Sequence, residues 1–258
     1  MKILITDKKK KEVFVSLFQV LKNCSSLISS IFDPEEIHIQ GMDKSHICLF
    51  DIKINKNWFN EYNVSKPTKI CFDSNVFHSI ISTKCDNQDL IIKMNDNDED
   101  TLHINFVNQE EKKGDFKKSF KLPLAEYEYE EMKIPSVEYD AEFSLSSKQI
   151  SDMFTQLNNF GNDIIIKCSE EDINLSTNGV SGEMRVDIPI DEVSSYSIVE
   201  GEEITLTYSL AYINKMCITN KLSTDIEFSL SNECPMKINY NLGDDSSLVF
   251  FIAPKMND

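Results

Sequence analysis

The sequence predicts an α+β protein of two similar domains, each with two helices packed on antiparallel sheet. A helix followed by a short alternating strand recurs four times, starting near residues 8, 74, 147 and 209. Turn signals such as Asn178-Gly179 separate the strands, which favours antiparallel sheet over parallel crossovers. A stretch containing Pro123 and Pro135 lies between the second and third repeats, and its prolines disfavour a long regular element.

The first repeat begins with the longest predicted helix, residues 8–24. Its apolar residues form a narrow stripe at helical spacing: Val13, Phe14, Leu17, Val20, Leu21 and Cys24. Lys11 and Lys22 are almost three helical turns apart, and Lys8 lies one turn before Lys11. We therefore expect a basic, exposed helix face, which is either a solvated surface or a binding surface.

Strand patterns follow this helix and recur in the second repeat. Residues 36–40 and 42–54 alternate between apolar and polar side chains, before a loop that holds the only tryptophan, Trp58. Asp73 or Ser74 can cap a short helix that extends to Ile81. Its strands are predicted at 89–94 and 101–107.

The third and fourth repeats follow the same order. Ser146 and Gln149 have the spacing of a capping box, and Gly161 ends the third helix. A fourth helix is predicted at 209–217. The strands that follow these two helices are predicted at 163–168 and 225–230. The domains are thus predicted at 1–121 and 140–258, with an interdomain connecting loop at 122–139.

Composition restricts the class of protein. The 258 residues are 41% hydrophobic and 27% charged, enough to bury a substantial core. The seven cysteines are scattered and form no CxxC motif, which indicates reduced thiols without a zinc site. No apolar run is long enough for a membrane span. A net charge of −17 disfavours binding to nucleic acid unless the basic residues gather on one face.

Motifs for catalysis and for cofactors are missing from the sequence. It contains no glycine-rich phosphate loop, GxSxG elbow or HExxH motif, so we expect neither an enzyme nor a cofactor. The acidic string at 96–100 lacks the turn glycine of a calcium loop, so we expect no metal site. The four histidines stand singly and are interpreted as structural residues.

Three segments carry a resemblance to a known family. MDKSHICL (42–49), KIPSVEY (133–139) and CPMKINY through SLVFFIAPKM (234–256) resemble the sliding clamp called proliferating cell nuclear antigen (PCNA), at the family's spacing. The resemblance extends over essentially the whole chain, and the connecting loop falls where the family has its interdomain linker. It implies the DNA clamp fold and a homotrimeric ring that encircles duplex DNA without reading its sequence.

The resemblance also implies a hydrophobic pocket for a short partner peptide with one aliphatic and two aromatic anchors, carried by DNA polymerases and other replication and repair proteins. The matching residues are Met42, His46, Leu49, Met132, Ile134, Pro135, Tyr139, Pro235, Phe251, Ile252, Ala253 and Pro254. Individual members such as Leu49, Phe251 and Ile252 are equally compatible with a purely structural place in the core.

DNA-facing lysines are implied on or beside the four helices: Lys8, Lys11, Lys22, Lys84, Lys148, Lys215 and Lys221. Other positions that are commonly basic in the family carry no basic residue here: Val15, Ser16, Ser79, Ser82, Asp152, Thr155, Ala211 and Ile218. Glu170 likewise stands where eukaryotic clamps usually carry the lysine that receives ubiquitin. We therefore expect looser contact with DNA than in the family at large.

Two edge strands are implied as the subunit interface, near 115–121 and 180–187. The candidate contact residues are Asp115, Phe116, Phe120, Val180, Met184 and Val186. Ordinary hairpin pairing inside one chain is the competing interpretation of these strands.

The resemblance predicts a polymerase processivity factor that requires a clamp loader and acts in the nucleus, or at a viral replication site if the source is a virus. Two alternatives stay open. The chain could be a monomeric clamp-like processivity subunit, or one member of a heterotrimeric clamp. An unrelated two-domain scaffold is a third class, and it would fail to bind the partner peptide.

Overall fold

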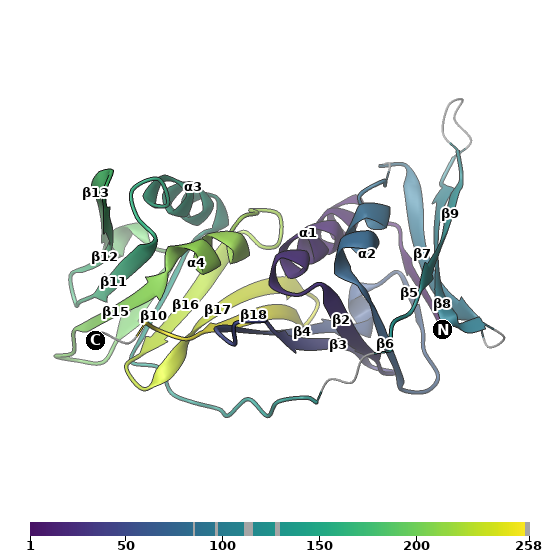
Figure 1. Ribbon diagram of the computed structural model, residues 1–258, viewed down its shortest axis with the longest axis horizontal. Coiled ribbons are helices and arrows are strands. Elements are labelled where there is room, and N and C mark those ends of the chain that lie inside the picture. The colour runs from purple at the N-terminus through teal and green to yellow at the C-terminus, as the bar shows by residue number, and fades with distance from the viewer. Residues whose placement is uncertain (85, 96–97, 111–115, 127–129, 256–258) are drawn as a thin grey trace. The chain divides into compact units, whose positions relative to one another are not determined.

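A computed structural model describes residues 1–84, 86–95, 98–110, 116–126 and 130–255 (Figure 1). The chain divides into two compact units. Unit 1 comprises Met1–Met42, Asp51–Met132 and Leu242–Ser247, and unit 2 comprises Asp43–Phe50, Lys133–Asn241 and Leu248–Asp258. Three described strands contribute residues to both units: β4 (Cys48–Asn55), β17 (Cys234–Gly243) and β18 (Ser246–Ile252).

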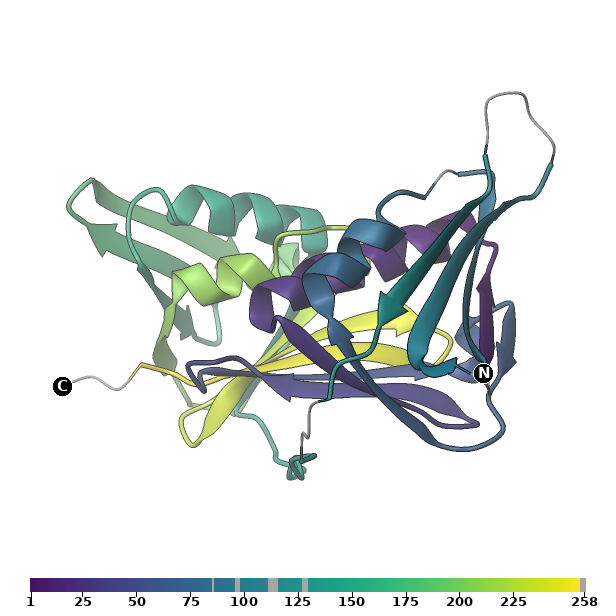
Figure 2. The same ribbon diagram turned by 45° about the vertical axis from the view of Figure 1, so that its right-hand side comes forward.

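Unit 1 contains two described helices, α1 (Lys8–Cys24) and α2 (Ser74–Ile81), and one short 3-10 helix, η1 (Lys56–Trp58). Its strands are β1 (Lys2–Ile5), β2 (Leu27–Phe32), β3 (Glu36–Met42), β5 (Glu61–Asn63), β6 (Thr68–Asp73), β7 (Gln88–Asn95), β8 (Asp98–Asn108) and β9 (Lys118–Pro123). One sheet has the order β5-β1-β7-β8-β9, and elsewhere β2 pairs with both β3 and β6. Figure 2 shows α1 and α2 side by side, as their contacts also indicate.

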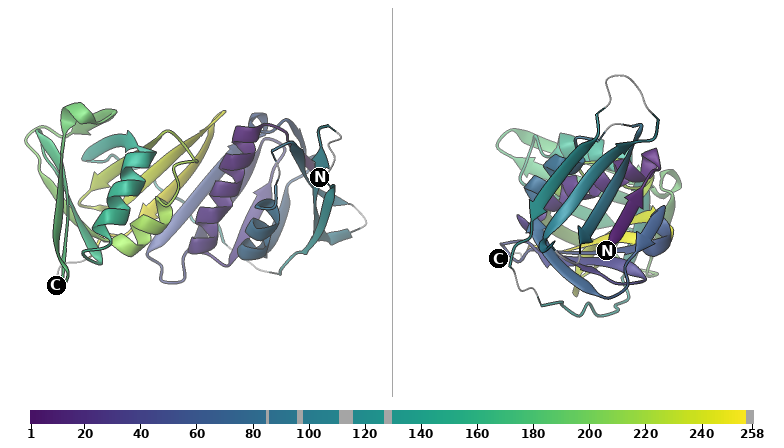
Figure 3. Two further views of the ribbon diagram at one scale, coloured as in Figure 1. Left: turned by 90° about the horizontal axis from the view of Figure 1, so that it is seen from above. Right: turned by 90° about the vertical axis from the view of Figure 1, so that its right-hand side faces the viewer.

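Unit 2 repeats this plan among its described residues, with helices α3 (Ser147–Leu157) and α4 (Leu210–Met216) and the 3-10 helix η2 (Ile190–Glu192). Its strands are β10 (Ala141–Ser146), β11 (Asp163–Cys168), β12 (Asp172–Gly179), β13 (Gly182–Pro189), β14 (Ser195–Ile198), β15 (Ile204–Ser209), β16 (Asp225–Ser231) and β17 (Cys234–Gly243). One sheet has the order β13-β12-β11-β15, and the other contains the order β14-β10-β16-β17. Seen from above, α3 and α4 lie against each other (Figure 3).

Helix α1 forms because its sequence supplies both a cap and an apolar face. The Asp7 side chain caps the first turn by accepting a hydrogen bond from the Lys10 amide at 2.8 Å. The buried face carries Phe14 and Phe18, whose rings meet edge to face at 5.1 Å, and both rings contact Phe77 of α2. Each such buried phenylalanine contributes about 2 to 3 kcal/mol relative to an exposed one. This aromatic cluster therefore fixes both helices onto the unit 1 sheets.

The core of unit 2 also contains a cluster of aromatic side chains between a helix and the sheet. Phe143 of β10 stacks on Phe228 of β16 at 5.0 Å, and Phe154 of α3 meets Phe228 edge to face at 6.1 Å. All three side chains are buried. The stack holds α3 on the sheet in the way that the aromatic cluster of unit 1 holds α1.

Four local features differ from the sequence-based prediction. Helix α3 ends at Leu157, four residues before the predicted Gly161. Strand β2 was not predicted, although it directly follows α1, because its central Ser29 and Ser30 interrupt the alternation. The predicted strand 42–54 begins only at β4, because His46 adopts a left-handed conformation (φ 56°) in the loop before it. Ser146 makes no capping hydrogen bond with its side chain, so the predicted capping box of α3 is absent.

Candidate functional site

The loop before β4 is organised by one buried carboxylate in unit 2. Asp43 accepts hydrogen bonds from the amides of Ser45, Ile47 and Cys48 at 2.7 to 2.8 Å. The Tyr212 hydroxyl of α4 donates a further one at 3.3 Å. Burial acts to raise the pKa of Asp43, but these hydrogen bonds outweigh it and lower the pKa below its usual value. Asp43 therefore holds the loop in its folded shape as a charged group.

The C-terminal segment lies against this loop. The Ala253 amide donates to the Ile47 carbonyl at 3.0 Å, and the Lys255 amide donates to the Thr207 carbonyl at 2.8 Å. The Lys255 ammonium binds both carboxylate oxygens of Asp163, at 2.6 and 2.7 Å. Two of the three segments that carry the resemblance, 42–49 and the chain after β18, thus meet within unit 2.

The end of the connecting loop joins the same unit through Tyr139 and Asp140. The Asp140 amide donates to the Leu230 carbonyl at 2.9 Å, which places it on the end of β16. The Lys237 ammonium of β17 lies 6.0 Å from the centre of the Tyr139 ring. Burial raises the pKa of Tyr139, with Cys234 and Glu142 adding to the shift.

The predicted peptide-pocket residues differ in accessibility. Ile134 is 37% exposed, and Leu49, Tyr139, Phe251 and Pro254 are half-buried. The remaining exposed members are His46, Pro135, Pro235 and Ala253. Ile252 is 0% exposed, because it lies on the inward face of β18, so its prediction as a pocket residue is corrected to a core position. Met42 and Met132 belong to unit 1.

The prediction of an exposed, DNA-facing Lys11 was wrong. Its side chain is completely buried, and its ammonium donates to the carbonyl oxygens of Asp86 and Gln88 at 2.9 and 2.5 Å. Burial lowers the pKa of Lys11, partly offset by the nearby carboxylate of Asp89. Lys11 thus satisfies two backbone acceptors at the start of β7, and it is not available to a ligand.

The other predicted lysines of unit 1 have protein partners. Lys8 is exposed but binds Asp86 at 2.7 Å, and Lys84 lies 3.8 Å from the same carboxylate. Lys22 of α1 hydrogen-bonds to Nδ1 of His78 on α2 at 3.2 Å. Burial lowers the pKa of His78, and the Lys22 charge adds to this effect. The helix face of unit 1 therefore has fewer unpaired ammonium groups than its lysine count predicts.

In unit 2 the predicted DNA-facing lysines are more accessible. Lys148 at the start of α3, Lys215 at the end of α4 and Lys221 after α4 are all exposed. The Lys215 ammonium lies 5.8 Å from the centre of the Tyr212 ring.

The two strands predicted as a subunit interface each end a sheet among the described residues. Strand β9 pairs with β8, and β13 pairs with β12. Phe116 before β9 is 77% exposed, and Val180 before β13 is fully exposed. Phe120, Met184 and Val186 are half-buried, and Asp115 lies outside the described residues.

The sequence reasoning missed a cluster on β3 and β4 of unit 1. His38 was interpreted as a structural histidine, yet its two ring nitrogens each lie 2.7 Å from a carboxylate, of Asp51 and Glu131. Gln40 binds the backbone of Met132. The available signal was the alternation of 36–40, which puts His38 and Gln40 on one face.

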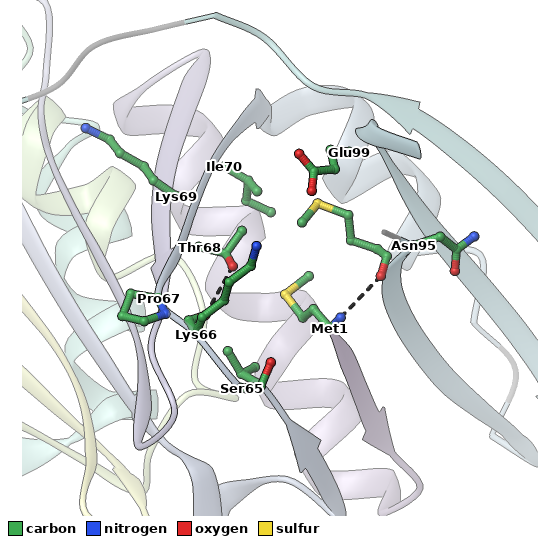
Figure 4. Close-up of a pocket in the computed structure, with 11 residues that line it drawn as sticks. Met1, Ser65, Lys66, Pro67, Thr68, Lys69, Ile70, Asn95 and Glu99 are labelled. Carbon is green, nitrogen blue, oxygen red and sulfur yellow. Dashed lines mark hydrogen bonds between the residues drawn. The ribbon is translucent and has the colours of Figure 1, made fainter. Parts of the chain in front are cut away.

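A separate hollow of about 320 Å³ lies in unit 1, between residues 64–70, which lead into β6, and the adjoining ends of β7 and β8 (Figure 4). The Met1 ammonium donates to the Met94 carbonyl there at 3.2 Å. Lys66 reaches over the hollow, whereas Lys69 and Asn95 point away from it (Figure 4). Its walls combine apolar and charged groups without a convergent set of ligands.

Among the described residues, no group of three or more histidine, cysteine, aspartate or glutamate side chains is arranged to hold a metal ion. Asp96 and Asn97 of the acidic string lie outside these residues, and Asp98 accepts a hydrogen bond from His103 at 3.0 Å. In the part of the chain that the structure describes, every helix is too short or too polar to span a membrane.

Comparison with known proteins identifies the family. The family described as "Proliferating cell nuclear antigen, N-terminal domain" matches residues 6–131, and its C-terminal counterpart matches residues 133–255. "Proliferating cell nuclear antigen 2" of Plasmodium falciparum (isolate 3D7) is 26% identical over 256 residues, covering 96% of this chain and 97% of that protein. "Proliferating cell nuclear antigen" of Chaetomium thermophilum is 25% identical over 255 residues, covering 96% and 95%. Because the two family domains together match nearly the whole chain, and two similar α+β units underlie that match, this chain belongs to the PCNA family of sliding clamps.

Proposed function

We propose that this chain assembles into a homotrimeric, non-enzymatic ring that encircles duplex DNA and serves as a polymerase processivity factor in replication and repair. Residues 1–121 and 140–258 would be its two clamp domains, joined by the connecting loop 122–139. Loading onto DNA would require a clamp loader, and the ring would act in the nucleus, or at a viral replication site.

The observation that carries this proposal is the pair of edge strands. Strand β9 ends one sheet and β13 ends another, and each begins beside a large exposed apolar side chain, Phe116 or Val180. An unpaired strand edge offers a row of backbone hydrogen-bonding groups to another chain. The exposed charges differ in balance, since β9 begins after Lys117 and carries Lys121, whereas β13 carries Glu183 together with an Arg185–Asp187 ion pair. Two different edges on one chain allow head-to-tail contacts that close into a ring.

Light scattering after size exclusion tests the assembly across a dilution series. We expect a mass three times the 29.6 kDa of the chain. Val180→Asp should reduce this to one chain, because it places a charge at the edge that must be desolvated. Val199→Asp is the matched control, since Val199 is also exposed (50%) but lies after β14, and this variant should remain trimeric. A single-chain mass for the unmodified protein would favour the monomeric subunit or the heterotrimer instead.

We further propose that the accessible part of the predicted pocket in unit 2 receives the partner peptide. The residues are His46, Leu49, Ile134, Pro135, Tyr139, Pro235, Phe251, Ala253 and Pro254. Support comes from the hydrogen bond between Ala253 and Ile47, which joins two of these segments. Apolar groups that are half-exposed in the free protein can be buried by aromatic anchors, which contribute most of the affinity in such sites.

For DNA, we propose that Lys148, Lys215 and Lys221 provide the main contacts. They are exposed beside α3 and α4, whereas Lys8, Lys22 and Lys84 of unit 1 have protein partners. Such contacts with phosphates would be weak and independent of sequence, which suits a ring that slides.

A further inference from the structure

Unit 1 contains a cluster that fastens the connecting loop to β3 and β4. We call it the connector clamp: His38 and Gln40 of β3, Asp51 of β4, and Glu131 and Met132 of the loop. His38 Nε2 lies 2.7 Å from Asp51 Oδ1, and His38 Nδ1 lies 2.7 Å from Glu131 Oε1. One imidazole ring therefore links the connecting loop to a sheet strand 80 residues earlier in the chain (Glu131 against Asp51).

Gln40 makes the second attachment. Its Oε1 accepts a hydrogen bond from the Met132 amide at 2.7 Å, and its Nε2 donates to the Met132 carbonyl at 3.1 Å. The same Nε2 lies 3.1 Å from Asp51 Oδ1. The carboxamide of Gln40, which is only 6% exposed, thus pairs with the Met132 backbone as a neighbouring strand would. Gln40 does not titrate, so pH acts on this attachment only indirectly, through the His38–Glu131 contact one residue earlier in the chain.

The attachment through His38 depends on the protonation of its imidazole ring. A neutral imidazole has one N–H donor, so it cannot donate to two carboxylates at once, whereas the imidazolium ion has two. After loss of the proton, one ring nitrogen would present a lone pair to a carboxylate at 2.7 Å. The side chain of Asp51 is 15% exposed and is also bonded to Gln40, while that of Glu131 is 49% exposed and can turn to water. Glu131 is therefore the contact that deprotonation breaks.

The charges around His38 favour the imidazolium. The hydrogen bond to Asp51 raises the pKa of His38, against burial, and the charges of Asp51 and Glu131 add to the increase. Lys53, also on β4, acts on Asp51 by lowering its pKa. On β2, the residue opposite His38 is the uncharged Ile31. Because the pKa of His38 is raised when the clamp is closed, the His38–Glu131 contact is fully formed at pH values below the ordinary histidine pKa. It is lost as the pH rises through the raised pKa.

We propose that the connector clamp positions the connecting loop for capture of the partner peptide, and that loss of the His38 proton weakens its hold on the loop. The inference rests on the proposed peptide pocket. Ile134 and Pro135 follow Met132 directly in the chain, so fixing Met132 restricts the start of the segment that meets the peptide. A segment that is already ordered loses less conformational entropy on binding, which increases affinity.

The first test measures the clamp without any peptide. Amide hydrogen exchange at Met132, corrected for the intrinsic exchange rate at each pH, should lose about three- to tenfold in protection between about pH 6 and about pH 8.5. His38→Gln, which cannot titrate, should show low and pH-independent protection. His103→Gln is the control, because His103 pairs with Asp98 on the same strand, β8, and should behave like the unmodified protein. Protection at Met132 that does not change with pH would overturn the clamp.

The second test measures affinity for a fluorescent peptide with a glutamine, an aliphatic and two aromatic anchors, over the same pH range. We expect the Kd of the unmodified protein to rise about threefold or more with pH, and that of His38→Gln to stay constant at the weaker value. Glu131→Gln, which keeps an acceptor without the charge, should shift the transition to lower pH. If the Kd does not change with pH while the exchange protection of Met132 does, the clamp does not position the loop for the peptide. Absence of peptide binding at every pH would instead refute the pocket itself.

Discussion

At the scale of single residues, Lys11 is the side chain whose role differs most from its prediction. Replacing it with methionine keeps most of the volume but leaves the Asp86 and Gln88 carbonyls without their donor. We expect Lys11→Met to lower the free energy of unfolding by about 2 kcal/mol, the usual cost of unsatisfied buried acceptors. Chemical denaturation measures this. The control is Lys9→Met at an exposed position, which should change the free energy of unfolding by less than about 0.5 kcal/mol. Equal values for the two variants would contradict the buried role of Lys11.

A second residue-scale prediction concerns the Asp43 carboxylate. Asp43→Asn should lower the free energy of unfolding by about 1 to 2 kcal/mol at neutral pH. The two Asp43 oxygens each accept two hydrogen bonds, whereas asparagine is uncharged and has an NH2 group, which cannot accept, in place of one oxygen. The folded-state pKa of Asp43 is lowered, so its contribution is full above the ordinary value of 3.8 and is lost as pH falls below it. Urea denaturation measures the free energy of unfolding of Asp43→Asn and of the unmodified protein. The difference between them should therefore become smaller from neutral to acidic pH.

The control for this experiment is Asp245→Asn, in an exposed turn. Its difference from the unmodified protein should be small at every pH. If the free energies of unfolding of Asp43→Asn and the unmodified protein still differ under acidic conditions, Asp43 acts through its shape and not through its charge.

The residues that sequence reasoning misjudged share one physical cause. Helical spacing puts Lys11 and Lys22 on one face of α1, but spacing alone cannot reveal that two backbone carbonyls at the start of β7 accept hydrogen bonds from the Lys11 ammonium. Likewise, the alternation of β18 makes Ile252 and Phe251 face opposite ways, but only the packing shows that Ile252 faces the core. The partners of His38 lie 13 and 93 residues away, beyond any local pattern.

At the scale of elements, the four α-helices of the described residues were predictable because their apolar stripes coincide with the packed faces. Helix α1 spans Lys8–Cys24 as predicted, and Asp73 caps α2 through the amides of Asn75 and Val76. Strand β2 was missed because it has two adjacent buried serines, which interrupt the alternation of apolar and polar side chains that predicts a strand. Strands depend on partners distant in sequence, so their limits are less visible than those of helices.

The connecting loop is the element whose proposed role is most directly testable. Ile134 and Val137 are equally apolar in kind and similarly exposed, at 37% and 36%. We expect Ile134→Ser to weaken binding of the fluorescent partner peptide at least about tenfold, since it removes an apolar contact that the peptide would bury in the proposed pocket. Val137→Ser should change the Kd less than about twofold. Fluorescence anisotropy measures both, and circular dichroism checks that each variant is folded. Equal losses in the two variants would remove Ile134 from the pocket.

At the scale of the whole molecule, a net charge of −17 constrains how DNA is held. Binding through counterion release needs many lysine–phosphate contacts and weakens steeply with salt. This chain offers few accessible helix lysines, so we expect no measurable binding to closed circular DNA without a loader at physiological salt. A ring can instead thread onto the open ends of linear duplex DNA.

Retention after blocking those ends separates threading from ordinary binding. The protein is mixed with linear duplex carrying biotin at both ends, streptavidin is added, and the DNA is separated from free protein by size exclusion. We expect co-elution that changes little between about 0.1 and about 0.5 M salt, because topology and not charge would hold the proposed ring. Cutting the same DNA internally with a restriction enzyme should release the protein, since new open ends appear. Protein that stays on the cut DNA, or that leaves blocked DNA as salt rises, would show that contacts with phosphates carry the binding and that no closed ring forms.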